Sequence, residues 1–199
     1  YYASAGLNDG RVLVVGGEYI SGTNTEDNPA EIYDPVTNSW SDAGFMSVPR
    51  YLSTATLLEN GMVLITGGIT FSGAGGVTES SAELYDPATN SWSPAAPMAV
   101  PRSDHTATLL ANGKVLVVGG TFTFSSAELY DPISNSWSSA GSITTGPNCF
   151  AATLLDNGQV LVGGGRGTSG GEVSLAHVEL YDPATNSWSS AAHWRSVSS

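Results

Sequence analysis

A repeated pattern of about 50 residues fills this chain and restricts its fold more than any other feature. Each copy holds a glycine pair after an apolar run, then Tyr-Asp-Pro, then a tryptophan seven residues after the tyrosine. The glycine pairs are Gly16-Gly17, Gly67-Gly68, Gly119-Gly120 and Gly164-Gly165. The tyrosines are Tyr33, Tyr85, Tyr130 and Tyr181, and the tryptophans are Trp40, Trp92, Trp137 and Trp188. We therefore expect four similar structural units in one register.

Two further features predict that each copy forms four short β-strands. Asn-Gly or Asp-Gly pairs stand between two apolar runs, and we expect type I′ hairpins there because such pairs tolerate positive φ at both central positions. These pairs are Asp9-Gly10, Asn60-Gly61, Asn112-Gly113 and Asn157-Gly158. A third strand carries the tyrosine, and a proline-containing turn leads into a fourth strand with the tryptophan. No stretch shows helical periodicity, so the fold class is all-β.

The combination of glycine pair, tyrosine and tryptophan at this period resembles the kelch repeat. The resemblance implies a kelch-type β-propeller, in which each repeat forms one blade of four antiparallel strands. It covers essentially the whole chain, 1–199, which we expect to be a single propeller domain or a propeller segment. The four blades are expected at approximately 1–43, 51–95, 103–140 and 148–191.

The sequence leaves the closure of such a ring open, because propellers have roughly four to eight blades. Three arrangements fit. Four blades close on themselves, two copies form a homo-oligomeric ring of eight, or further sequence supplies additional blades. We favour the third arrangement, in which the chain is part of a larger propeller.

Charge, apolar content and cysteine count exclude several classes of site. The chain has six Lys and Arg against 18 Asp and Glu, so its net charge is -12. Because few cations are available to bind phosphates, we expect no nucleic-acid binding. No apolar run approaches the roughly 20 residues of a membrane span, so we expect no membrane insertion. Cys149 is the only cysteine, which excludes an intrachain disulfide and a cysteine-based metal site. The Ser-, Thr-, Gly- and Asn-rich, lysine-poor composition favours a secreted or cell-surface protein.

The alternation of strand direction separates the loops onto two faces of a blade. Turns between strands one and two and between three and four fall on one face and are short and constant. The connections from two to three, and from four to the next blade, fall on the other face and contain the length variation. We expect binding on this variable face because recognition usually resides in variable loops on a rigid scaffold. The segments are 18–29, 69–80, 121–125 and 166–176, with 44–52, 96–104 and 141–149.

Several polar and aromatic residues in the variable segments are candidate ligand-binding residues. They are Glu18, Tyr19, Glu26, Asp27, Phe71, Arg166 and Glu172. An aromatic ring beside carboxylates suits a sugar, which stacks on the ring and donates its hydroxyl protons, and the carboxylates suit calcium. No EF-hand-like spacing supports calcium, so no cofactor is predicted. The alternative for each residue is a solvated loop with its ring folded back on the blade.

Two arginines at equivalent positions are further candidates. Arg50 and Arg102 each follow their tryptophan by ten residues. The resemblance to kelch propellers implies that arginines near this connection line a central ligand cavity. Pro147 takes the third equivalent position, so a ring of arginines is incomplete. The alternative is a structural pair with a blade glutamate, because Glu31, Glu83, Glu128 and Glu179 recur at one position and fit a scaffold role.

The chain also resembles the kelch portion of galactose oxidase-like copper enzymes, but it lacks their ligands. That copper site needs two histidines, a tyrosinate and a cysteine-modified tyrosine, whereas the only histidines here are His105, His177 and His193. Phe150 occupies the position equivalent to His105 in the next repeat, which favours a scaffold role for His105. No phosphate-binding loop or serine nucleophile motif is present either. We therefore expect no enzymatic activity.

These observations predict a non-catalytic extracellular or cell-surface recognition or scaffold module that binds protein or glycan through the variable face. Two alternatives stay open. One is a fragment of a galactose oxidase-like copper enzyme whose ligands lie partly outside this sequence. The other is a structural subunit of a larger assembly, in which the acidic surface serves solubility.

Overall fold

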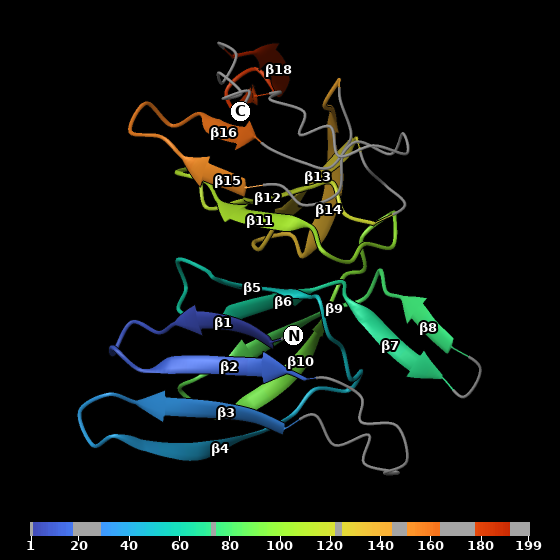
Figure 1. The fold of residues 1–199 in the computed structure, drawn as a ribbon. Helices are drawn as coiled ribbons and strands as arrows, with labels where there is room; N and C mark the ends of the chain where they lie inside the picture. Colours follow the sequence, from blue (N-terminus) through green and yellow to red (C-terminus); the bar gives the residue numbers. More distant parts are fainter. Residues whose placement is uncertain are drawn as a thin grey trace, which may run out of the picture. The chain divides into compact units, whose positions relative to one another are not determined.

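The computed structural model describes residues 2–17, 29–72, 75–121, 125–144, 151–163 and 178–191. Every regular element among them is a β-strand, and the strands form four four-stranded antiparallel sheets and one two-stranded sheet (Figure 1). The chain divides into two compact units, Tyr1–Ser103 and Asp104–Ser199, and each contains two of the four-stranded sheets. We call these sheets blades 1 to 4 in chain order.

Unit one contains blades 1 and 2. Blade 1 has the order β1-β2-β3-β4, with bounds Tyr2–Gly6, Val12–Gly16, Pro29–Asp34 and Ser39–Phe45. Blade 2 has the order β5-β6-β9-β10, with bounds Thr54–Leu57, Val63–Thr66, Ala82–Asp86 and Ser91–Ala95. Between β6 and β9 lies a separate two-stranded sheet of β7 (Ile69–Ser72) and β8 (Gly75–Thr78). The up-and-down strand order agrees with the expected blade topology.

Unit two contains blades 3 and 4, which have the same order. Blade 3 consists of β11 to β14, with bounds Thr106–Leu109, Val115–Val118, Ser126–Asp131 and Ser136–Ser142. Blade 4 consists of β15 to β18, with bounds Ala151–Leu154, Val160–Gly163, Val178–Asp182 and Ser187–Ser190. The described residues therefore give every repeat its four expected strands.

The repeated tyrosine and tryptophan are cross-strand partners on neighbouring third and fourth strands. Tyr85 lies opposite Trp92, and their ring centroids are 5.0 Å apart at an interplanar angle of 45°. The pairs in the other three blades have centroid distances of 5.1 Å. Such tilted aromatic pairs add to the apolar area that the rings bury. This explains why the two residue types recur at a fixed spacing of seven.

The conserved spacing of the turn between the third and fourth strands follows from its hydrogen bonds. In blade 2, Asp86 Oδ1 accepts from the N–H of Ala88 at 2.9 Å, an Asx-turn contact. Asn90 adopts φ of 51°, and its Oδ1 accepts from the Tyr85 hydroxyl at 2.7 Å. Asparagine tolerates this left-handed conformation better than most residues. The equivalent tyrosine–asparagine bond is 2.8–3.0 Å long in the other three blades.

The turns between first and second strands differ from the type I′ turns expected from the sequence. Of each Asn-Gly or Asp-Gly pair only the glycine has positive φ, as at Gly10 with 89° and Gly61 with 85°. The N–H of Leu7 donates to the carbonyl of Arg11, and Gly10 donates back to Leu7. These contacts define a three-residue loop that ends in a left-handed glycine. The expectation of type I′ geometry is therefore wrong.

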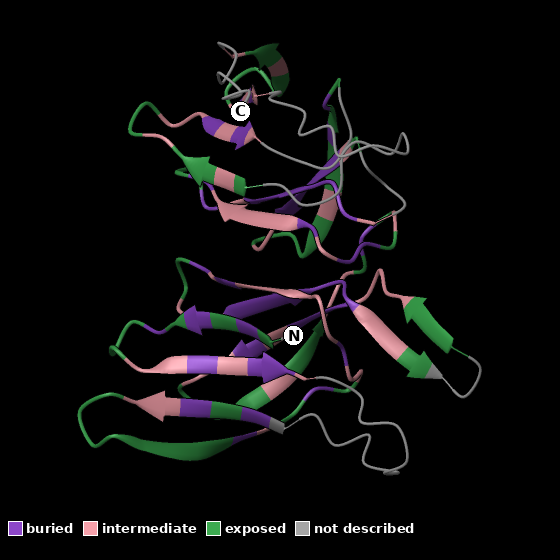
Figure 2. Cartoon of the chain, in the orientation of Figure 1, coloured by how far each residue is buried: buried purple, intermediate pink, exposed green. Residues whose placement is uncertain are grey.

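Each unit has a hydrophobic core between its two blades. In unit one, Leu13, Val15 and Ile32 of blade 1 cluster with Val63 and Ile65 of blade 2. Buried residues of both blades are purple in Figure 2, and along β1 and β2 they alternate with exposed or partly buried residues. In unit two, the core joins residues of blade 3, such as Leu116 and Val118, to Val160, Val162 and Tyr181 of blade 4.

Tryptophans of the second blade in each unit bond directly to the blade before it. Trp92 Nε1 donates to the carbonyl of Ala43 in β4 at 2.7 Å. Trp188 Nε1 donates to the carbonyl of Ala140 in β14, also at 2.7 Å. Both tryptophans are partly buried against their core. Trp92 therefore contributes to apolar packing within unit one.

Candidate functional site

The most distinctive part of the variable face is the β7–β8 hairpin of blade 2. It occupies the connection between second and third strands and projects away from the blade strands of unit one (Figure 1). Ile69 pairs with Thr78, Thr70 with Val77 and Phe71 with Gly76. Partnered residues of antiparallel strands share a face, so Phe71 and Val77 lie on opposite faces of the ribbon. Their exposed fractions are 40% and 49%, so the hairpin presents an apolar side chain on each face.

Backbone hydrogen bonds hold the base of the hairpin to the two neighbouring connections. Tyr51 and Ile69 exchange N–H···O bonds of 3.0 and 2.8 Å. The N–H of Gly68 donates to the carbonyl of Arg102 at 2.7 Å, and the N–H of Arg102 donates to Glu79 at 3.0 Å. A Cβ atom on Gly68 would lie 2.8 Å from the Tyr51 carbonyl oxygen, so only glycine fits this approach. The hairpin therefore has a fixed origin on the blade.

Tyr51 packs against the face of the hairpin that carries Phe71. The two rings are stacked, with centroids 5.3 Å apart and an interplanar angle of 13°. A Cβ on Gly76 would lie 2.8 Å from Ile69 Cγ2, so a side chain there would require Ile69 to shift, whereas the Tyr51 hydroxyl would be at an ordinary contact distance of 3.7 Å. Tyr51 thus stabilises the ribbon, and the two rings form one aromatic surface. We call Tyr51, Phe71 and Val77 the aromatic ribbon site.

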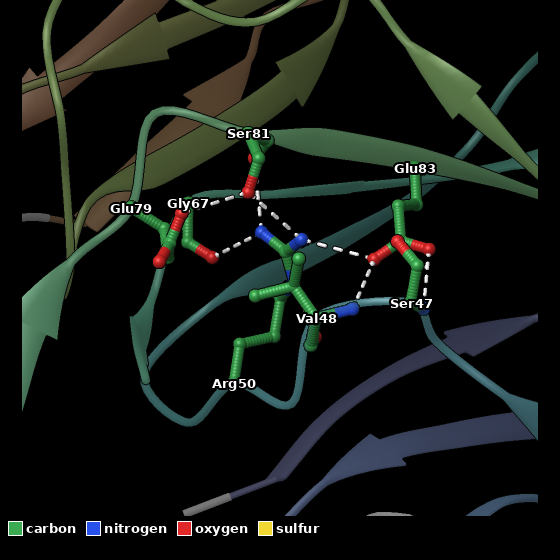
Figure 3. A network of polar contacts seen from close by, with 7 residues as sticks. All are labelled: Ser47, Val48, Arg50, Gly67, Glu79, Ser81 and Glu83. Carbon is green, nitrogen blue, oxygen red and sulfur yellow. Dashed lines mark hydrogen bonds and ion pairs between the residues drawn. The ribbon is translucent and has the colours of Figure 1, made fainter. Parts of the chain in front are cut away.

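A buried polar network around Arg50 joins the segments at the base of the hairpin (Figure 3). Arg50 Nη1 donates to the carbonyls of Gly67 at 2.8 Å and Ser81 at 2.9 Å. Its Nη2 donates to Ser81 Oγ and to Glu83 Oε1, both at 3.0 Å. Ser81 Oγ in turn donates to Glu79 Oε2 at 3.0 Å. The guanidinium therefore joins both ends of the connection that contains the hairpin.

Glu83 also fixes the connection that arrives from blade 1. Its Oε2 accepts from the N–H of Ser47 at 2.8 Å, and its Oε1 accepts from the N–H of Val48 at 3.2 Å. Burial lowers the pKa of Arg50, and the charge of Glu83 opposes that shift. Because an arginine begins from a very high pKa, the Arg50 guanidinium remains protonated near neutral pH.

The prediction that Arg50 and Arg102 contact a ligand does not fit the structure. Both side chains are fully buried, with exposed fractions of 0%. Arg50 instead forms the structural pair with a blade glutamate that the sequence left as the alternative. The physical reason is that the Arg50 guanidinium donates to buried carbonyl and carboxylate oxygens within the blade and is not exposed to a ligand.

Among its described residues, blade 4 repeats the glutamate contact through a threonine. Glu179 Oε1 accepts from the N–H and from the Oγ1 of Thr144, each at 2.9 Å. Thr144 follows Trp137 by seven residues, as Ser47 follows Trp40. Glu83 and Glu179 are 3% and 5% exposed, whereas Glu31 is exposed. The predicted scaffold role is therefore confirmed for Glu83 and Glu179, and it does not hold for Glu31 in this structure.

Of the loop candidates, Phe71 alone lies within the described residues. The others fall outside them: Glu18, Tyr19, Glu26, Asp27, Arg166 and Glu172. Within the described ranges, no group of three or more His, Cys, Asp or Glu side chains is placed to hold a metal ion. His105 is buried, and His177 and His193 fall outside the described residues. No long apolar helix suited to crossing a membrane occurs in the described part of the chain.

Sequence reasoning missed Tyr51 and the hairpin itself. Tyr51 directly follows Arg50, and the equivalent position after Arg102 is Ser103, so the repeat did not mark it. From the sequence we expect a loop over 69–80, although Ile-Thr-Phe-Ser and Gly-Val-Thr flank a glycine-rich turn. Alternating β-branched and aromatic residues around glycines are a hairpin signal that could have located it.

The comparisons with known proteins agree with this architecture. The Kelch motif family model matches residues 1–47, 60–99, 101–143 and 147–193, and the chain therefore belongs to the kelch-repeat family. The solved structure of YjhT superposes with a TM-score of 0.72 at 20% identity, covering 96% of this chain and 65% of YjhT. With the four sheets described above, this match confirms the all-β kelch-type propeller fold with four blades.

Two curated relatives show how much of a longer protein the chain represents. Kelch repeat and BTB domain-containing protein 12 of Danio rerio is 30% identical over 135 residues, which cover 59% of this chain and 21% of the relative. F-box/kelch-repeat protein At1g67480 of Arabidopsis thaliana is 37% identical over 112 residues, which cover 56% of this chain and 28% of the relative. The chain thus spans less than a third of the length of either relative.

Proposed function

We propose that this chain is a non-catalytic recognition module that binds a protein partner through the aromatic ribbon site. The supporting observation is the β7–β8 ribbon, which presents Phe71 on one face and Val77 on the other, and whose connection to the blade is held by the buried Arg50 network. Exposed aromatic and aliphatic groups on a rigid base are typical of the central part of protein interfaces. Kelch repeats of the relatives support an interaction or scaffold role.

The chemistry of the site favours a protein over a glycan. A sugar needs a flat ring together with polar groups that bond its hydroxyls. Near the ribbon, the Glu79 carboxylate already accepts a hydrogen bond from the Ser81 hydroxyl. The β8 residues that pair with Phe71 and Thr70 are Gly76 and Val77, which have no polar side chain to bind a sugar hydroxyl. An apolar ribbon with two usable faces fits a concave protein surface. Glycan binding, extracellular location and the absence of catalysis remain predictions from the sequence.

The test compares site variants with a matched control on the other face. Immobilised wild-type chain first captures partners from extracts of the native source, and each partner is then purified and titrated. Phe71→Ala is expected to weaken binding at least tenfold, because interface aromatics often contribute about 2 kcal/mol or more. Val36→Ala changes a residue that is 92% exposed in the turn between β3 and β4, and it is expected to leave affinity within about twofold.

Two results would overturn the proposal. Affinity that is unchanged in both Phe71→Ala and Val77→Ser would place binding elsewhere. The second result is that no protein binds, while the wild-type chain binds an immobilised glycan and Phe71→Ala abolishes that binding. The ligand of the site would then be a sugar and not a protein. Far-ultraviolet circular dichroism and urea unfolding of each variant show whether lost binding reflects the site or the fold.

A further inference from the structure

Three turns between first and second strands carry a pair of residues that is prone to a spontaneous covalent change. Asparagine followed by glycine deamidates faster than asparagine before a larger residue, because glycine has no side chain to hinder attack by its own backbone nitrogen. The pairs lie in blades 2, 3 and 4, and the proposed recognition function uses none of them. They are Asn60-Gly61, Asn112-Gly113 and Asn157-Gly158.

Deamidation joins the glycine nitrogen to the side-chain carbonyl carbon of the asparagine. The nitrogen attacks this carbon and forms a five-membered succinimide, and the side-chain nitrogen leaves as ammonia with the proton that the glycine nitrogen gives up. Water then opens the ring at either carbonyl, which yields aspartate or isoaspartate. The reaction therefore needs only water, a glycine N–H that can lose its proton and a side-chain amide that can turn towards it.

In blade 2, hydrogen bonds engage both reacting groups. The N–H of Gly61 donates to the Leu58 carbonyl at 3.0 Å, and Asn60 Oδ1 accepts from the N–H of Met62 at 3.1 Å. The first bond holds the proton that the glycine nitrogen must lose, and the second fixes the orientation of the amide. The N–H of Leu58 also donates to the Met62 carbonyl at 2.8 Å, and Leu58 is 2% exposed. Opening this turn therefore disturbs a buried part of the blade.

The same two bonds engage the pairs in blades 3 and 4. The glycine N–H donates at 2.9 Å in both blades, to the carbonyl of Leu110 or of Leu155. The asparagine Oδ1 accepts from the N–H of Lys114 at 3.1 Å and from that of Gln159 at 3.0 Å. Asn157 Nδ2 also donates to Gln159 Oε1 at 3.0 Å, so both polar atoms of this amide are held. The engagement is thus a property of the turn in all three blades.

Blade 1 shows that one of the two products fits the turn. Its equivalent pair is Asp9-Gly10, in which Asp9 Oδ1 accepts from the N–H of Arg11 at 3.0 Å. The N–H of Gly10 donates to the Leu7 carbonyl, also at 3.0 Å. Aspartate therefore supports both bonds that the Asn-Gly pairs form. Isoaspartate does not, because it adds a methylene to the backbone before the glycine and displaces that N–H from its leucine carbonyl.

We propose that the first turns of blades 2, 3 and 4 are deamidation sites that the folded turn keeps unreactive and that react when the turn opens. An open turn has the reactivity of an unfolded chain, so the product accumulates in proportion to the time that the turn spends open. Aspartate lets the turn close again with its two hydrogen bonds. Isoaspartate weakens the blade that carries it, so the two products of one reaction have opposite consequences for the fold.

The first test compares deamidation rates in the folded and unfolded chain. Residues 1–199 are incubated in buffer and in concentrated urea at one pH and temperature, and peptide mapping by mass spectrometry follows each pair. A peptide of residues 57–64 in both solvents corrects for any effect of urea on the chemistry. Each pair is expected to react at least about tenfold more slowly in buffer, where circular dichroism verifies the fold. Rates within about twofold at any pair would overturn the proposal.

The second test compares the two products at position 60. Asn60→Asp is expected to keep the wild-type melting temperature, whereas the control Asn60→Ala removes the Oδ1 acceptor and should lower it by a few degrees. Chains with isoaspartate at this position, purified from the urea sample and refolded, are expected to melt below Asn60→Asp or to fail to refold where that variant succeeds. Equal melting of the two products, or equal losses in Asn60→Asp and Asn60→Ala, would overturn the proposal.

Discussion

At the scale of the single residue, the energy that a repeated side chain contributes depends on what covers it. Trp40 and Trp92 occupy the same position of the repeat and pair with a tyrosine at almost the same distance. Trp92 packs against the shared core and donates to Ala43, whereas Trp40 is 55% exposed. The two residues therefore form a matched pair for measuring the effect of blade packing.

We expect Trp92→Ala to lower the free energy of unfolding of residues 1–199 by on the order of 3–5 kcal/mol, through a cavity and a lost hydrogen bond. Trp40→Ala is expected to cost about 1 kcal/mol, mainly the aromatic pair with Tyr33. Urea unfolding followed by circular dichroism measures both changes. Equal losses in the two variants would contradict the difference in burial.

The buried tyrosines predict a decline of stability at alkaline pH. Burial raises the pKa of Tyr85, Tyr130 and Tyr181, and each hydroxyl also donates to an asparagine in its turn. Because the folded pKa lies above the unfolded value of about 10, the stability from neutral tyrosine is fully present below that pH and is lost as the pH rises.

Unfolding free energies measured from about pH 9 to about pH 11 are therefore expected to fall, and ultraviolet titration should show a late-titrating group of tyrosines. Tyr85→Phe is expected to reduce the late-titrating amplitude and to cost about 1 kcal/mol at neutral pH. If Tyr85→Phe left the late-titrating amplitude unchanged, the enclosure of Tyr85 would be in doubt.

At the scale of the element, each turn depends on one glycine conformation. Gly10 has φ of 89° and Gly6 does not have positive φ, and a Cβ at either would meet no atom within 4 Å. Gly10→Ala is therefore expected to destabilise by about 1 kcal/mol through backbone conformation alone. Gly6→Ala is the control, and it is expected to be neutral or slightly stabilising. Thermal unfolding of the two variants distinguishes backbone strain from a steric contact of the added methyl group. Equal destabilisation of Gly6→Ala would contradict the claim that the positive φ of Gly10 causes the loss.

The glutamate of the third strand predicts a second contrast between equivalent positions. Glu83→Gln breaks the buried pair with Arg50 and leaves a guanidinium without its counter-charge, so we expect a loss of about 3–5 kcal/mol. Glu31→Gln, at an exposed position, is expected to change stability by less than about 0.5 kcal/mol. Chemical denaturation of both variants gives the comparison. A small loss in Glu83→Gln would mean that the network does not hold the hairpin connection.

Strand number, strand order and the pairing of tyrosine with tryptophan were predictable, because hydrophobic alternation and turn residues are local signals repeated four times. The type I′ expectation was wrong because the same Asn-Gly pair also suits a three-residue loop, and the choice depends on the register of the flanking strands. The role of Tyr51, and the choice between the two roles considered for Arg50, were not predictable for a different reason. Burial and ring stacking join residues from separate connections, and the repeat period carries no information about such contacts.

At the scale of the whole molecule, the kelch repeat forms a common scaffold, and the variable connections are the parts that differ from blade to blade. Blade residues recur, but the β7–β8 ribbon occurs in blade 2 alone among the described connections. Its base is fixed by Gly68, Arg102 and the Arg50 network, so a partner would meet a preformed surface. Preorganisation reduces the conformational entropy lost on binding. The account therefore depends on one central claim, that recognition occurs at this ribbon.

Amide hydrogen exchange of the chain, with and without its purified partner, tests that claim most directly. We predict slower exchange across Ile69–Ser72 and Gly75–Thr78 in the complex, with no change in the turn between β3 and β4 that carries Val36. Protection of the turns between third and fourth strands, with an unchanged ribbon, would contradict the account and move recognition to the opposite face.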